Sequence, residues 1–407
     1  MPKSCPTCSV DLDNIKIDVH IDDIRLIAKR TGISFCMECG KCTSTCPVAL
    51  LDPEFSPRKI ASKAITGGGI SLLTAKQIWS CLTCGLCNEH CPSDVRFVDF
   101  ITQMRSLAGI KGQEAPCSHG GAMQSLMKLM TAPDMKQNRL DWLTNDLKTS
   151  KTGDYALFVG CLPYYDAYFD DLKLDSVNIA KSAIRILNHA GIVPAVMDDE
   201  RCCGHDLKYS GDVDIFRMLI DRNVKCLSKT KAKTIITTCA ECFRTLKFDY
   251  PDYSEFPFKV KHISEFISEN ADKIKTTESG KKVTFHDPCR LSRHAGVIDA
   301  PRTALESVGE LVEMPNSKRQ SQCCGTSSWM NCDIHSKMRQ AARLKEAIST
   351  GADLLVTSCP KCMIHFKCAQ NDPMSAGQLE IEIKDLAEIV AENLAKMGTV
   401  PVRHESS

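Results

Sequence analysis

The sequence predicts an α/β protein, with an α-helical N-terminal module followed by two copies of a parallel α/β unit. Three observations support this fold class. Up to about residue 107, apolar residues recur at helical spacing without strand signals. From residue 153 onward, short apolar strands alternate with amphipathic helices, which is typical of parallel sheets. A pattern of five cysteines also occurs twice, with equivalent cysteines 120 to 128 residues apart, and this indicates an internal duplication.

The composition limits the classes of function. A chain of 407 residues can hold about two to four compact units. The net charge is +1, so no overall field favours nucleic acid or an anionic membrane surface. No apolar run of about 18 residues could span a bilayer, and the first residues lack the apolar stretch of a secretion signal. The 24 cysteines, many of them in C-x-x-C units, therefore indicate metal ligation in a reducing cytoplasm.

Two copies of the motif C-x-x-C-x-x-C-x-x-x-C-P lie in the N-terminal module. In this motif three close cysteines wrap one [4Fe–4S] cube, and the fourth ligates the neighbouring cube. We therefore predict two cubane clusters that exchange their fourth ligands. The ligands are Cys36, Cys39, Cys42 and Cys91 for the first cluster, and Cys81, Cys84, Cys87 and Cys46 for the second. A pair of zinc sites is the alternative, although this order with a trailing proline rarely serves zinc.

Helices are predicted around these motifs at residues 19–31, 57–65, 71–79 and 95–107. A further helix at 123–130 lies in a segment that we interpret as a linker. The predicted domains are 1–115 for the helical module, 116–152 for the linker, and 153–279 and 280–407 for the two α/β units. Cys5 and Cys8 form an isolated C-x-x-C, which fits half a zinc site, a redox pair or two free thiols.

Each α/β unit is predicted from alternating strands and helices. The first has strands at 155–159, 192–197 and 234–238 and helices at 176–189 and 212–228. The second has strands at 283–286, 311–313 and 354–357 and helices at 335–348 and roughly 384–397. Every cysteine group follows a predicted strand. Because the carboxyl ends of parallel strands meet at one edge, cysteines about 40 residues apart can converge there.

Each α/β unit contains a lone cysteine, a Cys-Cys-Gly and a C-x-x-C. The two sets are Cys161, Cys202, Cys203, Cys239 and Cys242, and Cys289, Cys323, Cys324, Cys359 and Cys362. Five thiols exceed the four of a standard cube. A cube with a spare thiol and a zinc site with a disulfide are possible interpretations. A cluster with more than four cysteine ligands explains the number best.

At this point the residues resemble a known family. The doubled C…C-C-G…C-x-x-C pattern resembles the CCG domain of the heterodisulfide reductase B-subunit, and the N-terminal module resembles the α-helical ferredoxin module of the C-subunit. With the C-like module before the B-like domains in one chain of this length, residues 30–370 resemble the D-subunit of methanogen-type heterodisulfide reductase. The resemblance implies that each CCG set holds a noncubane [4Fe–4S] cluster. It also implies that these clusters, fed by the two cubanes, reduce the disulfide of coenzyme M and coenzyme B to two thiols.

Ionisable residues near the CCG sets are candidates for substrate chemistry. His286 is the preferred proton donor and His205 a second candidate, because histidine titrates near neutral pH. Arg290 is the preferred contact for an anionic substrate group, and Lys361 lies inside the last C-x-x-C. The simpler interpretation is that they donate hydrogen bonds to cluster sulfur or carry surface charge. Cys117, Cys226, Cys332 and Cys368 are expected to be plain thiols.

Two other functions stay open. The chain could be an iron–sulfur electron-transfer subunit of a related membrane or hydroxyacid-dehydrogenase complex that acts on another disulfide or on quinone. It could also be a pure electron carrier with structural CCG sets. No G-x-G-x-x-G follows a predicted strand, so electrons must come from a partner, either a membrane cytochrome b subunit or a soluble flavoprotein. We expect a cytoplasmic chain that reaches a membrane only through such a partner.

Overall fold

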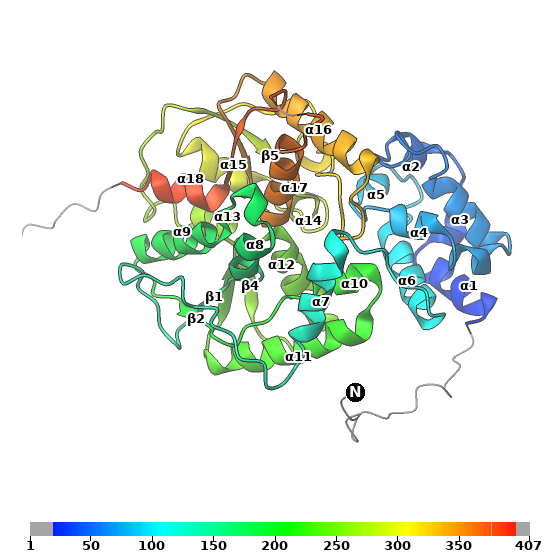
Figure 1. Ribbon diagram of the computed structural model, residues 1–407, viewed down its shortest axis with the longest axis horizontal. Helices are drawn as coiled ribbons and strands as arrows, with labels where there is room; N and C mark the ends of the chain where they lie inside the picture. Colours follow the sequence, from blue (N-terminus) through cyan, green and yellow to red (C-terminus); the bar gives the residue numbers. More distant parts are fainter. Residues whose placement is uncertain (1–18, 376, 396–407) are drawn as a thin grey trace, which may run out of the picture.

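The computed structural model describes residues 19–375 and 377–395, so Cys5 and Cys8 lie outside the described part of the chain. Its first part is a helical module, drawn in blue and cyan in Figure 1. The helices are α1 (Ile21–Arg30), α2 (Lys41–Ser44), α3 (Pro57–Ile65), α4 (Lys76–Ser80), α5 (Leu86–Glu89) and α6 (Phe97–Ile110). Residues 19–149 contain no strand in the structure, as predicted.

Local sequence explains where α3 begins. Helix α3 begins where the Ser56 side chain accepts a hydrogen bond from the Lys59 amide, with Pro57 in the first turn. The predicted helix at 71–79 is wrong in part, because a 3-10 turn at Gly69–Leu72 and the short α4 replace it.

The linker contains α7 (Ala122–Leu129), which matches the predicted helix to within one residue. The Ser118 amide before this helix donates to the Trp329 carbonyl at 2.7 Å, in the second α/β unit. Ser150 at the end of the linker pairs with Ala195 in the first unit. The linker therefore contacts both α/β units. The domain bounds at 115, 152 and 279 stay predictions.

The first α/β unit is built on a four-stranded parallel sheet. Its strands are β1 (Tyr155–Phe158), β2 (Ala195–Val196), β3 (Thr234–Thr237) and β4 (Lys259–His262), in the order β2-β1-β3-β4. Helices α8 (Leu162–Tyr168), α9 (Ser176–His189), α10 (His205–Ser210), α11 (Val213–Lys229), α12 (Ala240–Arg244) and α13 (Ile263–Glu269) connect or follow these strands.

The second unit repeats the same topology. Its strands are β5 (Lys282–His286), β6 (Glu310–Leu311), β7 (Leu354–Thr357) and β8 (Glu382–Asp385), in the order β6-β5-β7-β8. Its helices are α14 (Cys289–Ser292), α15 (Asp299–Glu306), α16 (Ile334–Ser349), α17 (Pro360–Gln370) and α18 (Leu386–Glu392). The identical strand order confirms the predicted duplication.

Two strands were not predicted from the sequence. Strand β4 was missed, and so was β8, which precedes the final helix. The helix predicted at roughly 384–397 is confirmed as α18, which begins two residues later than predicted. Both strands lie at sheet edges and read Lys259-Val-Lys-His262 and Glu382-Ile-Lys-Asp385. Their alternating polar residues reflect an edge with one exposed face, whereas every residue after the first is buried in each of the central strands.

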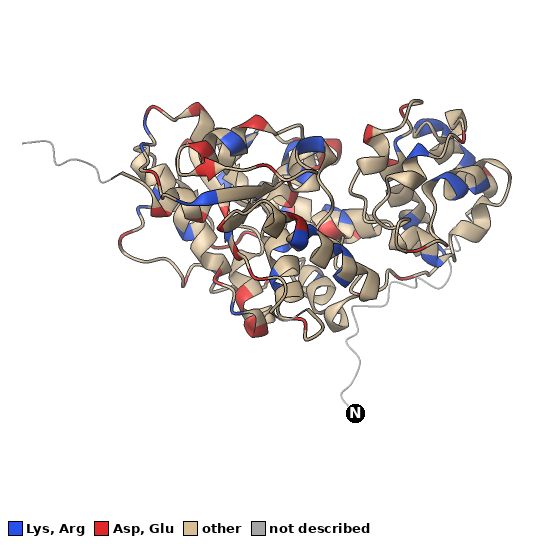
Figure 2. Ribbon diagram, turned by 90° about the horizontal axis from the view of Figure 1, so that it is seen from above, with Lys and Arg blue, Asp and Glu red and all other residues tan. Residues whose placement is uncertain are grey.

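The two units pack against each other through their helices. Helix α9 of the first unit lies on α18 of the second, and α13 lies on α15. Figure 1 shows the two units side by side, with the helical module next to α10 and α16. In Figure 2 this module lies at one end of the α/β body, and basic and acidic residues are interspersed over both. No helix in residues 19–395, leaving out 376, combines the length and apolar character needed to cross a membrane.

Candidate metal centres

The first ferredoxin-type site is a cavity at the protein surface. Its wall includes Cys36, Cys39, Cys42 and Cys91, which are the four cysteines assigned to the first cluster. Gly40, with φ of 81°, begins α2 between them and allows the sharp turn of the loop. Cys39 is exposed, so this site lies near the protein surface. The structure thus brings together cysteines from both sequence motifs.

The second ferredoxin-type site is a neighbouring cavity. It is lined by Cys81, Cys84 and Cys87 of the second motif and by Cys46 of the first, as the exchanged-ligand pattern requires. Cys87 also contacts the first cavity, so the two sites adjoin. The thiol groups and the enclosed space fit [4Fe–4S] clusters at both sites.

The first CCG set lines a third cavity. All five thiols are within its wall: Cys161, Cys202, Cys203, Cys239 and Cys242. The wall also contains His205, Asp206 and Glu241. Cys161 follows β1 and Cys239 follows β3, so the carboxyl edge of the sheet gathers the set as expected.

A buried ion pair that sequence reasoning missed fixes the turn before Cys161. Arg139 in the linker contacts Glu200 at 3.0 Å, and both side chains are 1% exposed. The Glu200 carboxylate accepts hydrogen bonds from the Val159 and Gly160 amides, and Arg139 donates to the Gly160 carbonyl. Burial raises the pKa of Glu200 to about 7, although Arg139 opposes this shift. No local motif joins these residues, because they are about 60 positions apart.

The second CCG set is a continuous group of thiols. Hydrogen bonding between Cys289 and Cys323 lowers the pKa of Cys289 and raises that of Cys323. Hydrogen bonding with Cys323 and Cys362 lowers the pKa of Cys324. Hydrogen bonding with Cys324 and Cys359 raises the pKa of Cys362. All five predicted members are therefore brought together. His365, one helical turn after Cys362, places Nδ1 3.3 Å from the Cys324 sulfur.

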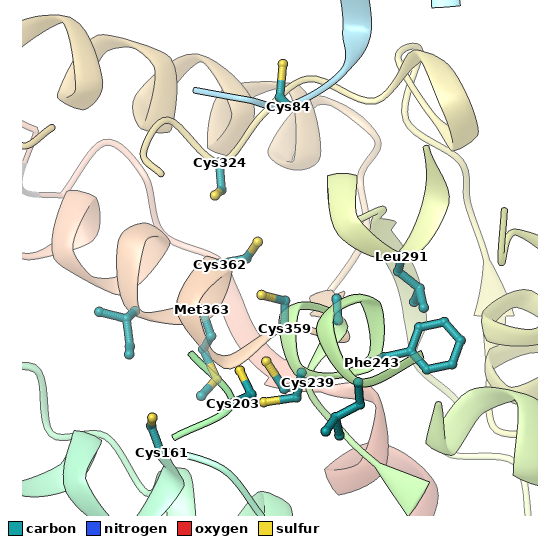
Figure 3. Packing of buried hydrophobic residues seen from close by; sticks show 14 of the residues in the cluster. Cys84, Cys161, Cys203, Cys239, Phe243, Leu291, Cys324, Cys359, Cys362 and Met363 are labelled. Atoms are coloured by element: carbon teal, nitrogen blue, oxygen red, sulfur yellow. The ribbon is translucent and has the colours of Figure 1, made fainter. Parts of the chain in front are cut away.

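The two CCG sets meet at their C-x-x-C loops. The Ala240 amide donates to the Ser358 carbonyl at 3.2 Å, which joins the two loops directly. Hydrogen bonding to the Cys239 thiol raises the pKa of Cys359. Figure 3 shows Cys324, Cys362, Cys359, Cys239 and Cys203 following one another between the two units. The sets therefore face each other rather than occupying remote ends of the sheets.

The second ferredoxin-type site reaches the second CCG set. A hydrogen bond with the Cys323 thiol is the main reason that the pKa of Cys84 is lowered to about 6. Figure 3 places Cys84 at the end of the row of thiols nearest Cys324, with Cys161 at the opposite end. Thr83 Oγ1 also lies 3.0 Å from Ser327 Oγ. The order along the molecule is therefore ferredoxin-type site, second CCG set, first CCG set.

Three of the predicted catalytic candidates form a buried charged group between the sets. Lys361 contacts both Asp206 and, at 2.7 Å, Glu241. The Asp206 carboxylate lies 3.0 Å from His205 Nδ1. Burial by itself would raise the pKa of Asp206, but Lys361 and His205 hold it below its usual value. Burial lowers the pKa of His205 to about 4, so its ring is neutral at pH 7.

Arg290 also belongs to this group, but its guanidinium N–H groups already donate to other residues of the protein. Its Nε donates to His205 Nε2 at 2.7 Å, and its other nitrogens donate to the carbonyl and hydroxyl of Thr83. The guanidinium also lies 3.8 Å from the centre of the Tyr209 ring. An anionic substrate group would have to displace one of these partners. Arg290 thus connects the loop between Cys81 and Cys84 to the first CCG set.

The fourth candidate, His286, lies apart from this group. Its Nδ1 accepts a hydrogen bond from Arg343 Nε at 3.1 Å, and its ring packs edge-on against Phe366. Burial is the main reason that its pKa is lowered to about 3. His286, at the end of β5, is therefore neutral at pH 7 and contacts Arg343 of α16 and Phe366 of α17. Its role as a proton donor stays a prediction.

Sequence reasoning missed several buried residues that position these sites. Arg105 on α6 donates to the carbonyls of Ile78, Cys81 and Tyr209. It therefore fixes the second motif against α10. Its distance in sequence from Tyr209 left no local signal. His365, in contrast, had one, because a residue three positions after Cys362 on a helix lies on the same face.

Comparisons with known proteins agree with this arrangement. A family model described as a 4Fe-4S dicluster domain matches residues 32–95, and one described as a cysteine-rich domain matches 155–247 and 283–367. The D-subunit of the dihydromethanophenazine:CoB–CoM heterodisulfide reductase of Methanosarcina barkeri is 32% identical, over 88% of this chain and 93% of that protein. The chain belongs to the heterodisulfide reductase D-subunit family.

Two further likenesses extend this result. The B-subunit of the CoM/CoB fumarate reductase of Methanothermobacter marburgensis is 30% identical, over 82% of this chain and 67% of that protein. A crystal structure of a hypothetical protein from Helicobacter pylori has a TM-score of 0.54 at 12% identity, over 85% of this chain and 69% of that one. This last likeness shows the fold alone. As a member of the D-subunit family, the chain is an iron–sulfur oxidoreductase subunit that binds [4Fe–4S] clusters.

Proposed function

We propose that this chain is the catalytic subunit of a heterodisulfide reductase, which reduces the coenzyme M–coenzyme B disulfide to two thiols. The observation that carries the proposal is the meeting of two complete five-cysteine sets at Cys239 and Cys359. Reduction of a disulfide takes two electrons and leaves two sulfur atoms to be captured. Two equivalent sites on either side of one substrate match that requirement.

The cysteines have defined roles in this proposal. Each CCG set holds one noncubane [4Fe–4S] cluster, and the two ferredoxin-type sites hold one cubane each. When bound, these clusters supply one-electron transfer and iron that accepts a thiolate. The chain keeps the CCG thiols of both sets in the interior, and nine of these ten cysteines are buried. Burial excludes water from the thiols and strengthens electrostatic interactions around them.

The direction of electron supply follows from the order of the sites. Cys39 is exposed at the first ferredoxin-type site, whereas Cys84 contacts the second CCG set. Electrons would therefore enter at the outer site from a partner, either a membrane cytochrome b subunit or a soluble flavoprotein. A cytoplasmic chain that associates with a membrane through that partner fits this supply.

The second candidate is an electron-transfer subunit of a related membrane or hydroxyacid-dehydrogenase complex, acting on another disulfide or on quinone. The similarity to a fumarate reductase supports this candidate, since that relative is named for a different electron acceptor. Its name also contains the coenzymes M and B, as does that of the D-subunit relative. This shared pair of thiols favours the first candidate.

The test is anaerobic EPR of the purified chain with and without the coenzyme M–coenzyme B disulfide. We expect about 16 iron atoms per chain, from four clusters of four. A paramagnetic signal should depend on the disulfide and disappear in Cys324→Ser and Cys203→Ser. Cys226→Ser is the matched control, because Cys226 is a buried cysteine of α11 outside both sets. About 8 iron atoms, or a response to other disulfides only, would reject the proposal.

A further inference from the structure

Two buried arginines flank the contact between the second ferredoxin-type site and the second CCG set. Arg293 donates to the carbonyls of Cys84 and Ser321 at 2.8 and 2.6 Å. Arg339 on α16 is 8% exposed. A Cβ built on Gly325, directly after Cys323-Cys324, would lie 3.5 Å from the Arg339 Cβ. Arg339 therefore packs against the Cys-Cys-Gly turn of the second set.

Arg339 differs from Arg293 because the protein leaves most of its donors unused. Its Nε and Nη1 atoms are buried and have no hydrogen-bond partner. Its remaining contacts are weak: Nη2 lies 3.3 Å from Ser336 Oγ and 4.0 Å from Asp333. A buried donor without a partner costs roughly 1–3 kcal/mol, and more for a charged group. A hydrogen-bond acceptor bound at this place would remove that cost.

Arg339 packs beside the Cys-Cys-Gly turn at which the second CCG set meets the second ferredoxin-type site. Burial lowers the pKa of Arg339 from its ordinary value, and the charges of Cys323, Asp333, Cys46 and Cys84 act against this shift. Cys46 and Cys84 belong to the second ferredoxin-type site, and Cys323 belongs to the second CCG set. The guanidinium thus adds positive charge where the two sets of cluster ligands approach each other. Iron-bound thiolate and sulfide are negatively charged acceptors for N–H groups.

We propose that Arg339 is a positioning residue for electron transfer, which holds its charge and its unpaired Nε–H and Nη1–H groups beside the cluster bound at the second CCG set. The inference rests on the proposed clusters, and it adds a residue that holds positive charge where they approach each other. Reduction adds one negative charge to a cluster, so a nearby cation stabilises the reduced form. Arg339 therefore raises the reduction potential of a cluster at the junction.

The experiment is an EPR-monitored redox titration of the anaerobically purified full chain. In Arg339→Gln the midpoint potential of a cluster at the junction should fall by about 59 mV, a tenfold change in the equilibrium constant for one electron. Arg339→Lys keeps the charge and should recover most of the shift. Arg319→Gln is the matched control, because Arg319 pairs with Glu89 across the same interface but is 45% exposed. Its midpoint potentials should equal those of the unaltered chain.

Iron analysis accompanies every titration. Unchanged midpoint potentials in Arg339→Gln with full iron would overturn the proposal. Equal loss of iron in Arg339→Gln and Arg339→Lys would also overturn it, because the residue would then be structural. Arg339→Met, which keeps the volume without the charge, decides the question if the glutamine variant does not fold, and should show the same fall. Failure of the proposed function is distinguishable, since it appears as a low iron content or a missing disulfide response in the unaltered chain.

Discussion

At the scale of single residues, the glycine of each Cys-Cys-Gly is required by two independent constraints. Gly204 and Gly325 have φ of 79° and 97°, in the left-handed region that other residues avoid. A Cβ on Gly204 would come 2.6 Å from the Phe216 ring, and one on Gly325 would come 2.9 Å from the Ser336 carbonyl. The helix that packs against each turn therefore leaves no room for a side chain. These contacts place the paired thiols against the helices α11 and α16.

Gly204→Ala should therefore destabilise the protein by about 2–4 kcal/mol, which combines backbone strain with overpacking. Gly191→Ala is the control, because Gly191 has the same φ of 79° but no atom within 4 Å of an added Cβ. It should cost only about 1–2 kcal/mol from strain. Anaerobic urea unfolding measures both. Equal losses of stability would show that contact with Phe216 is unimportant.

At the scale of elements, the end of β4 is tied to both α13 and the loop before Cys239. The His262 side chain accepts a hydrogen bond from the Ser264 amide and thereby caps α13. Its Nε2 lies 3.1 Å from the Thr238 carbonyl and donates to it. Burial lowers the pKa of His262 to about 4, so the ring is neutral at pH 7. The neutral form is required, because a proton on Nδ1 would remove the helix cap.

This lowered pKa predicts a loss of stability in acid. Between about pH 6.5 and pH 4 the unfolded chain binds a proton at His262 that the folded chain does not. Stability is full above this window and falls as the pH decreases through it, by up to about 3 kcal/mol. His262→Asn can keep the cap without the titration, so its melting temperature should fall less steeply with acid. Superimposable pH profiles of the two proteins would contradict this assignment.

At the scale of the whole molecule, buried charge joins the two duplicated units. Lys361 and Glu241 occupy equivalent positions in the two C-x-x-C loops, yet one is basic and the other acidic. The ammonium of Lys361 is 3% exposed and pairs across the interface with Glu241 and Asp206. Divergence of the two copies thus converted an equivalent position into a complementary pair. This pairing holds the two CCG sets in register.

Lys361→Met should destabilise the protein by about 3–5 kcal/mol, because Asp206 loses its buried partner. Adding Asp206→Asn should recover part of the loss, with a coupling energy of about 1–3 kcal/mol in a double-mutant cycle. Lys281→Met removes a lysine whose partner Glu382 is 46% exposed, and it should change stability by less than about 1 kcal/mol. Anaerobic urea titration measures the cycle. Strictly additive losses would show that Lys361 and Asp206 are not coupled.

The sequence by itself determined which residues could bind metal and which elements carry them. Local chain geometry determines the cysteine spacing within each ferredoxin-type motif. It also determines the order of strand and cysteine in each α/β unit. The central strands β1 and β7 are short and almost wholly apolar, so their pattern was sufficient to find them. The edge strands β4 and β8 were missed because alternation with lysine resembles one face of a helix over so short a span.

Only the tertiary structure decided how these sites relate to one another. The contacts of Cys84 with Cys323 and of Cys239 with Cys359 join residues more than 100 positions apart, which no local pattern encodes. The same holds for Arg339, whose unpaired donors are visible only once α16 is packed against the thiols. Packing also showed that the donors of Arg290 are already used by Thr83 and His205. The approach of two sites that are distant in sequence depends on the whole set of helix and sheet contacts. The cysteines that could bind metal can instead be recognised from the sequence alone.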